Sequence, residues 1–297
     1  RQFRSERDGP WRAETAQLKD GWSAEMFLPW SMMSMPDSAN YTRTMGIALQ
    51  RAVAHKNQTW GIPALPRTTG LFMSRLHKLV LTDVNPKQQI TFYPFISTSF
   101  DGVKHEATAK AGFDIFWRPT TNFQITSSIN PDFGNVESDD IVVNLTSYET
   151  FYPEKRPFFL EGQEIFITSP RASTRHGASH RSPVTLLNTR RIGSPARAPD
   201  DEDLILTRLE RNQPSELLGA VKITGQSGAL RYGLLTAFEN KTDFNGVIDE
   251  QSVNIRQTGR DFSAARMLYE RSSANGRKSI GFISTQVSHP EETATTH

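Results

Sequence analysis

Hydrophobic and polar residues alternate along much of the chain. In residues 229–239, Leu230 and Leu234 fall on one side of an extended backbone, whereas Arg231 and Gly233 fall on the other. The alternating segments are residues 89–98, 110–118, 122–129, 217–225, 229–239, 261–271 and 278–287. Alternation with a period of two predicts β-strands, and the short polar turns between several segments predict antiparallel hairpins. The pattern therefore indicates an all-β protein.

The first segment contains a proline that limits its place in a sheet. Pro94 lies inside residues 89–98. Because proline has no backbone N–H, it is found at sheet edges and bulges. We expect an edge strand or a bulge here.

The first part of the chain has a different pattern. Its alternating segments are shorter, and its apolar residues show little helical periodicity. Residues 21–28 alternate until Pro29, and residues 45–53 predict a second strand. We interpret residues 1–82 as the C-terminal part of a β-sandwich. A turn-rich joint then leads into a second domain, residues 83–297.

Four tryptophans lie in the first 60 residues: Trp11, Trp22, Trp30 and Trp60. We expect most of them to fill the core of the sandwich, which is the common place for tryptophan. An exposed tryptophan can instead stack on a sugar ring. Trp22, Trp30 and Trp60 are therefore the carbohydrate-binding candidates.

Residues 169–203 interrupt the strands and are rich in Ser, Arg and Pro. Apolar positions do not recur there, so we predict a long loop. His176 and His180 have the spacing of two metal ligands on a helix. The surrounding composition opposes a helix, and we predict no metal site.

Composition excludes several classes of protein. The chain has no cysteine, which excludes a disulfide scaffold and thiolate metal sites. A net charge of +2 argues against a nucleic-acid partner held by bulk charge. No apolar run approaches the roughly 20 residues of a membrane-spanning helix.

The alternation itself has two interpretations. A membrane β-barrel needs strands with one apolar face toward lipid and one polar face toward the interior. A soluble antiparallel sheet with one wet face gives the same pattern. The pattern alone favours neither.

Acidic side chains are most frequent between residues 130 and 166. Glu149, Glu154, Glu161 and Glu164 could supply the two carboxylates of a glycosidase. A Ca²⁺ site with oxygen ligands is a second interpretation. In a third, the acids pair with Lys155 and Arg156 and cap turns. We assign no catalytic residue and predict no cofactor, with Ca²⁺ as the alternative.

The same region carries a long ungapped motif. Its residues are Asn130-Pro131-Asp132-Phe133, Val136-Glu137, Asp139, Val143-Asn144-Leu145 and Glu149-Thr150-Phe151-Tyr152-Pro153-Glu154-Lys155-Arg156-Pro157-Phe158-Phe159-Leu160-Glu161-Gly162. This block resembles the signature of a bacterial outer-membrane family. Its members join a domain similar to family 9 carbohydrate-binding modules to a C-terminal β-barrel domain of unknown function, DUF5916. Residues 20–30 and 218–225 resemble strands of the first and second domain, respectively.

The resemblance implies a location, partners and a structural role for charged residues. It implies an outer-membrane barrel whose N-terminal domain lies in the periplasm or outside. The implied partners are outer-membrane lipid and a glycan or other envelope ligand. The charged residues of the motif would tie a loop to the mouth or interior of the barrel: Asp132, Glu137, Asp139, Glu154, Lys155, Arg156 and Glu161.

We expect a piece of a longer protein, because the chain starts at Arg1 without a leader pattern. It also departs from the family pattern, since it holds only the end of the carbohydrate-binding-like domain and too few strands for the family's barrel. We interpret residues 290–297 as a polar tail and not as a strand that closes a barrel. A membrane-associated glycoside hydrolase and a soluble glycan-binding or adhesive module remain the alternative functions.

Overall fold

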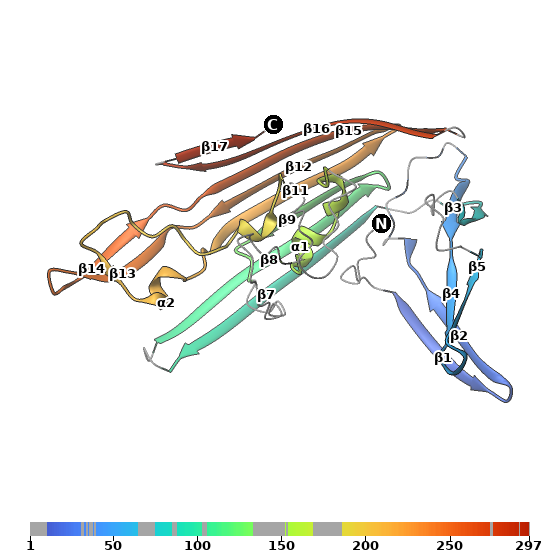
Figure 1. The fold of residues 1–297 in the computed structure, drawn as a ribbon, viewed down its shortest axis with the longest axis horizontal. Helices are drawn as coiled ribbons and strands as arrows, with labels where there is room; N and C mark the ends of the chain where they lie inside the picture. The colour runs from blue at the N-terminus through green and yellow to red at the C-terminus, as the bar shows by residue number, and fades with distance from the viewer. Residues whose placement is uncertain are drawn as a thin grey trace.

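The computed structural model describes residues 11–30, 33, 35, 38, 40–64, 75–84, 88–102, 106–132, 152, 154–168, 186–273, 276–290 and 292–296. These residues form an all-β fold, as the alternation predicted (Figure 1). The two short α-helices are α1 (Pro157–Leu160) and α2 (Arg208–Arg211). Among the described residues, no helix is long and apolar enough to cross a membrane.

Eight antiparallel strands form the main sheet, in the order β17-β16-β15-β12-β11-β9-β8-β7. Their bounds are β7 (Gln89–Asp101), β8 (Glu106–Thr120), β9 (Phe123–Ile129), β11 (Leu217–Ser227), β12 (Leu230–Glu239), β15 (Asp261–Ser273), β16 (Gly276–His289) and β17 (Glu292–Thr296). Each predicted alternating segment is a strand of this sheet. In the described part of the chain the sheet is open, with β7 and β17 at its edges.

The two edges bear on two predictions. Pro94 lies in β7, so the predicted edge position is confirmed. The polar tail predicted at residues 290–297 needs correction, because Glu292–Thr296 pairs with β16 as a short strand at the open edge of the sheet. A polar segment can do so at an edge, where pairing needs only its backbone N–H and C=O groups.

Strand register assigns every side chain to one of two faces. Ile125 pairs with Ile223, and Ile223 pairs with Leu234. We call the face with these residues the outer face. We call the opposite face, with Lys222 and Leu235, the inner face. Large apolar side chains on the outer face are exposed, such as Leu234, or half-buried, such as Ile125, whereas Lys222 and Leu235 are buried.

The inner face is covered by two segments of the connection between β9 and β11. We call residues 154–166 and 186–194 together the cover. The first holds α1 and a 3-10 helix, η4 (Gln163–Ile165), and the second holds η5 (Thr189–Arg191). Figure 1 shows α1 lying over the sheet. The cover and the sheet share one core: Phe158, Phe159, Ile165, Phe166, Ile192, Leu217, Ala220, Leu235, Ala237, Phe262, Ala264 and Ile283.

The predicted loop over residues 169–203 needs correction in its second part. Ile192 is 1% exposed and belongs to the core, and Leu186 and Leu187 pack against it. These apolar residues follow no strand or helix period, so the sequence pattern could not reveal their burial. Residues 169–185, with His176 and His180, lie outside the described residues.

A three-stranded sheet extends the main sheet at one end. It consists of β10 (Ile205–Leu206), β13 (Thr242–Ile248) and β14 (Gln251–Gln257). Along the chain, β13 follows β12 and β14 precedes β15, so the hairpin prolongs those strands (left in Figure 1). Phe244 is fully buried against Leu204 and Leu206. This hairpin lies outside the alternating segments from which the strands were predicted.

The two ends of the main sheet differ. At one end short turns join β8 to β9, β11 to β12 and β15 to β16. At the other end the connections between β9 and β11 and between β12 and β15 hold the cover and the β13–β14 hairpin. The N-terminal region enters at the short-turn end, because β7 begins there.

The described N-terminal residues form three two-stranded sheets. These pair β1 (Arg12–Leu18) with β2 (Gly21–Phe27), β3 (Arg43–Ile47) with β6 (His77–Leu81), and β4 (Leu49–Val53) with β5 (Gln58–Ile62), and η2 (Ala54–Lys56) joins β4 to β5. The predicted strand over residues 45–53 is thus two strands, separated at Ala48.

The expected burial of most tryptophans is wrong for the described structure. Trp11, Trp22, Trp30 and Trp60 are 45%, 54%, 39% and 62% exposed, respectively. A two-stranded sheet buries a large side chain only where a second layer packs on it. The four side chains therefore lie on the surface.

Candidate functional site on the inner face of the sheet

A buried carboxylate–guanidinium pair holds the two segments of the cover together. Glu154 Oε2 lies 2.8 Å from Arg156 Nη2, and Arg156 Nε donates to Glu154 Oε1 at 2.8 Å. The Thr189 hydroxyl donates to Glu154 Oε2 at 2.7 Å. The backbone N–H groups of Lys155 and Arg156 donate to Oε1. The carboxylate is thus surrounded by donors from both segments.

Arg156 completes this connection. Its Nη1 donates to the Ile192 carbonyl at 2.7 Å and its Nη2 to the Thr189 carbonyl at 2.6 Å. Its guanidinium carbon lies 4.2 Å from the centroid of the Phe159 ring. A planar guanidinium with several fixed donors suits this arrangement better than an ammonium group would. We call Glu154, Arg156 and Thr189 the cover latch.

The latch sets the protonation of Glu154. Burial raises the pKa of the Glu154 carboxyl, but hydrogen bonds and charge attraction from Arg156, with the Thr189 hydroxyl, outweigh it. The net pKa lies below its ordinary value of 4.5. A general acid near neutral pH needs the opposite shift. The geometry favours a structural carboxylate at this position.

A second carboxylate ties the cover to the sheet. Glu239, at the end of β12, accepts from Arg260 Nε at 2.8 Å and from the Gly193 N–H at 3.0 Å. Arg260 Nη2 also donates to the Ser194 hydroxyl at 3.2 Å. Because Glu239 binds both the cover and the chain before β15, it fixes the bend into the β13–β14 hairpin.

Two cations of the inner face bind backbone carbonyls of the cover. Lys222 on β11 is 3% exposed, and its Nζ donates to the Phe158 carbonyl. Arg266 Nε on β15 donates to the Ile165 carbonyl at 3.3 Å. Carbonyls near the ends of such short helices have few intrahelical partners, so the two cations satisfy them.

The sheet leaves room for the cover at a glycine. A Cβ atom on Gly233 would lie 2.8 Å from the Phe166 ring and 3.0 Å from Ile165 Cγ2. A side chain there would push the cover off β12. Gly233 thus permits close contact between the cover and the sheet.

A polar row continues across the inner face toward β8. Arg118 Nη2 donates to Gln124 Oε1 at 2.6 Å and to Glu161 Oε1 at 3.3 Å. Farther along β8, Asp114 accepts from the Ser128 hydroxyl at 2.5 Å. The polar groups of this row are therefore paired with one another, and they share the inner face with apolar core residues such as Leu235.

A family model for a domain of unknown function, DUF5916, matches residues 86–294. The chain belongs to the DUF5916 family. No curated protein and no solved structure matches it. The matched residues contain the main sheet from β7 to the first part of β17, as well as the cover.

This DUF5916 structure brings some of the predicted site residues together. Glu154 and Arg156 form the latch, and Glu161 binds Arg118. Glu164 is exposed, and Lys155 and Asp132 are half-buried. Glu137, Asp139 and Glu149 lie outside the described residues. The described residues hold no cluster of three His, Cys, Asp or Glu side chains suited to a metal ion.

Sequence reasoning missed Lys222 and the Glu239–Arg260 pair. One signal was available for Lys222, because it is a lone cation between Ala220 and Thr224 on one face of a strand. The Glu239–Arg260 pair carried no such signal, since its partners come from a bend that the pattern did not predict.

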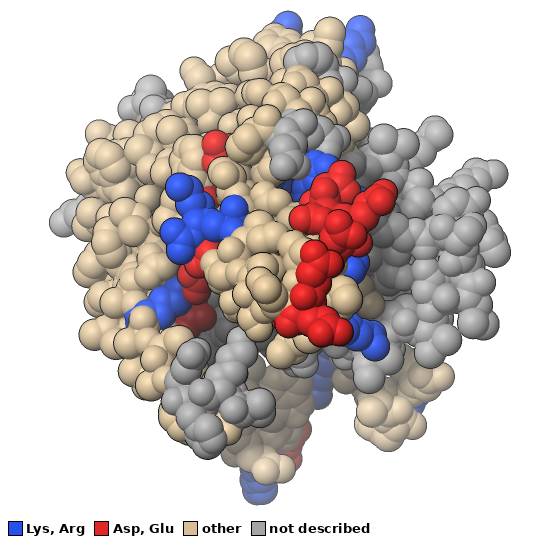
Figure 2. Space-filling view, turned by 90° about the vertical axis from the view of Figure 1, so that its left-hand side faces the viewer, with Lys and Arg blue, Asp and Glu red and all other residues tan. Residues whose placement is uncertain are grey.

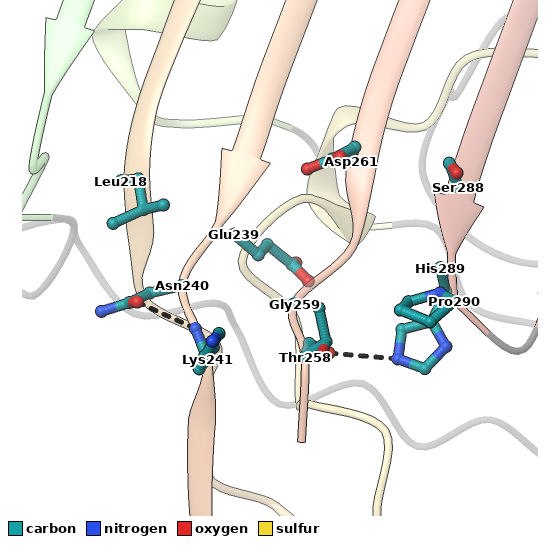
Figure 3. Close-up of a pocket in the computed structure, with 10 residues that line it drawn as sticks. All are labelled: Leu218, Glu239, Asn240, Lys241, Thr258, Gly259, Asp261, Ser288, His289 and Pro290. Atoms are coloured by element: carbon teal, nitrogen blue, oxygen red, sulfur yellow. Dashed lines mark hydrogen bonds between the residues drawn. The ribbon is translucent and has the colours of Figure 1, made fainter. Parts of the chain in front are cut away.

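A hollow of about 410 Å³ opens where β12 and β15 bend away from the main sheet (Figure 3). Glu239, Asp261 and His289 are among the residues that line it. The His289 ring lies 3.1 Å from the Thr258 carbonyl through Nε2. Glu239 is already bound by Arg260, so its carboxylate stabilises the bend between β12 and β13.

The end of the molecule beyond this hollow is acidic. Figure 2 shows a ridge of Asp and Glu side chains there, beside a smaller group of Lys and Arg. The exposed acids of the β10–β13–β14 sheet and its approach are Asp200, Asp201, Glu202, Asp203, Asp243, Asp249 and Glu250. Their charge contrasts with the outer face of β7, β8, β9, β11 and β12, which carries no Asp, Glu, Lys or Arg.

Proposed function

We propose that the main sheet is part of the wall of an outer-membrane β-barrel, with the outer face toward lipid and the cover inside. We further propose that the N-terminal region binds glycans or related envelope ligands. The observation that carries the first proposal is the chemistry of the outer face.

The outer face is apolar and uncharged over five neighbouring strands. By register, the outward positions of β7, β8, β9, β11 and β12 carry no Asp, Glu, Lys or Arg. Many of their side chains are aliphatic or aromatic, and Ile96 is 82% exposed. Soluble monomers rarely expose apolar patches of such extent. Lipid is the environment in which this surface is stable.

The outward charges on β15 and β16 lie near strand ends. Asp261 stands at the start of β15, and Arg271 pairs with Lys278 near the opposite end of the β15–β16 hairpin. Charged groups are tolerated near the two membrane interfaces and are costly at the midplane. Their placement thus fits an apolar band between two polar borders.

Strand length also supports a membrane wall. β11, β12 and β15 have 11, 10 and 13 residues. A tilted strand needs about 9–11 residues to cross the hydrocarbon core. Soluble sheets more often use strands of about five or six residues.

The difference between the two ends of the sheet supports one orientation of the sheet in the outer membrane. Outer-membrane barrels have short periplasmic turns and longer outer loops. On this basis the short-turn end faces the periplasm, and the N-terminal region lies there too. The β13–β14 hairpin and its acids then lie at the extracellular end of the barrel.

The inner face fits the interior of such a barrel. Its buried carboxylates are paired: Glu154 binds Arg156 within the cover latch, and Glu239 binds Arg260 and the cover, which holds the folded loop against the wall. Exposed Trp22, Trp30 and Trp60 support glycan binding, because aromatic rings stack on sugars.

The wall can be tested by folding the chain in detergent micelles and in lipid vesicles. We expect strand-rich circular dichroism, co-flotation with vesicles, and a change in gel mobility between unheated and boiled samples. A soluble β-protein of similar size serves as the control. A chain that stays folded in buffer without detergent and does not float with vesicles would contradict the proposal.

A further inference from the structure

We propose that Trp22, Arg51 and Trp60 form a binding site for anionic glycans, meaning sugars that carry carboxylate or sulfate groups. The inference rests on the proposed glycan binding and adds the class of ligand and the role of each residue.

The three side chains come from two separate hairpins. The Arg51 guanidinium carbon on β4 lies 5.0 Å from the centroid of the Trp22 ring on β2. Arg51 is directly opposite Trp60 in the β4–β5 pair, so the two side chains share a face. Directly opposed residues have Cβ atoms about 4.5–5.5 Å apart. Arg51 therefore contacts the Trp22 ring and is the cross-strand neighbour of Trp60.

All three residues are accessible. Trp22 is 54% and Trp60 62% exposed, and Arg51 is exposed as well. A cation that served only to fill a core would be buried between the rings. Here the guanidinium edge and the Trp60 ring remain open to a ligand.

The charge of this surface selects the ligand. The strand positions that share a face with Trp22 and with Trp60 carry no Asp or Glu. Glu14 and Glu25 pair with each other on the opposite face of the first hairpin. Lys56 is a second exposed cation of this hairpin, at the turn between β4 and β5. An anionic ligand on these strand faces thus meets Arg51 without a carboxylate on the same faces.

Each residue has a distinct role. Trp60 is the platform, and its Nε1 donates to Gln58 Oε1 at 3.3 Å, which orients the ring. Arg51 binds the anionic group, because guanidinium pairs with carboxylate or sulfate through two parallel hydrogen bonds. Trp22 is a positioning residue that holds Arg51 by a cation–π contact. Neutral sugars would use the platform but gain nothing from Arg51.

The test measures binding of the full chain to polygalacturonate and to its methyl ester, and to dextran sulfate and dextran, by calorimetry at low and moderate salt. We expect the anionic polymer of each pair to bind at least tenfold more tightly. Arg51→Gln should remove that preference, and Trp60→Ala should weaken all binding. Trp22→Ala should reduce the preference, with recovery in Trp22→Phe.

Arg12→Gln is the matched control, since it removes the same charge from the opposite face of the first hairpin. It should leave the preference unchanged. An equal loss in Arg12→Gln would show attraction by bulk charge and overturn the site. Trp60→Phe keeps the platform testable if Trp60→Ala does not fold.

The failure of this inference is distinct from that of the proposed function. Equal binding of the charged and neutral polymers would overturn the anionic site and leave glycan binding in place. Absence of binding to all four polymers would overturn both. Membrane insertion is measured separately and depends on neither result.

Discussion

The two faces of the main sheet are made by alternate residues of the same strands, yet they are stabilised in opposite ways. On β12, Leu234 points outward and is 51% exposed, whereas the adjacent Leu235 points inward and is 4% exposed. Outward positions are largely uncharged and are covered by no described part of the chain. Inward positions include Lys222, Glu239 and Arg266, and each binds a group far away in the sequence.

This difference shows where specificity lies. An uncovered apolar face needs a suitable environment and few particular partners. A covered face with buried charges needs each partner in place, because an unpaired buried charge is costly. Substitutions on the two faces should therefore fail for different reasons, and the following experiments separate these reasons.

The largest effect is expected from Arg156→Ala. It leaves the Glu154 carboxylate buried without its cation and removes the donors to two carbonyls of the cover. Breaking a buried pair in this way costs about 3–5 kcal/mol. Urea unfolding of the detergent-folded chain measures the loss. Arg256→Ala, which breaks the exposed pair with Asp243, is the control and should have little effect. Similar losses in both variants would contradict the role of the latch.

Leu234→Arg tests the outer face. A positive charge near the membrane midplane destabilises a barrel by about 2–4 kcal/mol. An exposed surface position in a soluble sheet would tolerate the same change within about 0.5 kcal/mol. The free energy of unfolding from lipid vesicles measures the effect, and Ser252→Arg on the exposed β14 strand is the matched control. Equal stability of the two variants would place the outer face in water.

Gly233→Ala tests the contact between cover and sheet. Its Cβ would approach the Phe166 ring to 2.8 Å, and overpacking of this kind costs about 1–3 kcal/mol. The comparison is Gly102→Ala, where a Cβ meets no atom within 4 Å. Thermal unfolding should distinguish them. If Gly233→Ala is as stable as Gly102→Ala, the cover does not pack as described.

The smallest effect is a pH dependence. Because the pKa of Glu154 is lowered in the folded state, its contribution to stability is complete above about pH 4.5 and is lost as the pH falls through the folded value. Wild type should therefore lose stability on acidification more steeply than Glu154→Gln. Unfolding midpoints between pH 3 and 7 measure this difference. Parallel pH profiles would show that Glu154 is not held as a carboxylate.

The sequence was a good guide to the strands of the main sheet and a poor guide to what covers them. Alternation depends on neighbours two residues apart, and it predicted β7, β8, β9 and the later long strands. The cover depends on contacts across the chain, such as Arg156 with Thr189 and Ile192, more than 30 residues away. Glu154 and Arg156 were candidates because of their motif, but their burial required the structure.

In the N-terminal region the sequence predicted burial that the structure does not show. Its tryptophans predicted a core by composition, whereas the described hairpins expose them. The contact of Arg51 with Trp22 joins two hairpins, and no local pattern encodes it.

The most direct test of the central claim is the depth of the outer face in a bilayer. The chain has no cysteine, so Leu234→Cys provides a single labelling site on β12. A fluorophore at this position should be quenched by brominated lipid and protected from aqueous iodide. A fluorophore at Ser252→Cys, on β14, should show the reverse. If the Leu234 label is quenched by iodide and unaffected by brominated lipid, the outer face does not lie in the membrane.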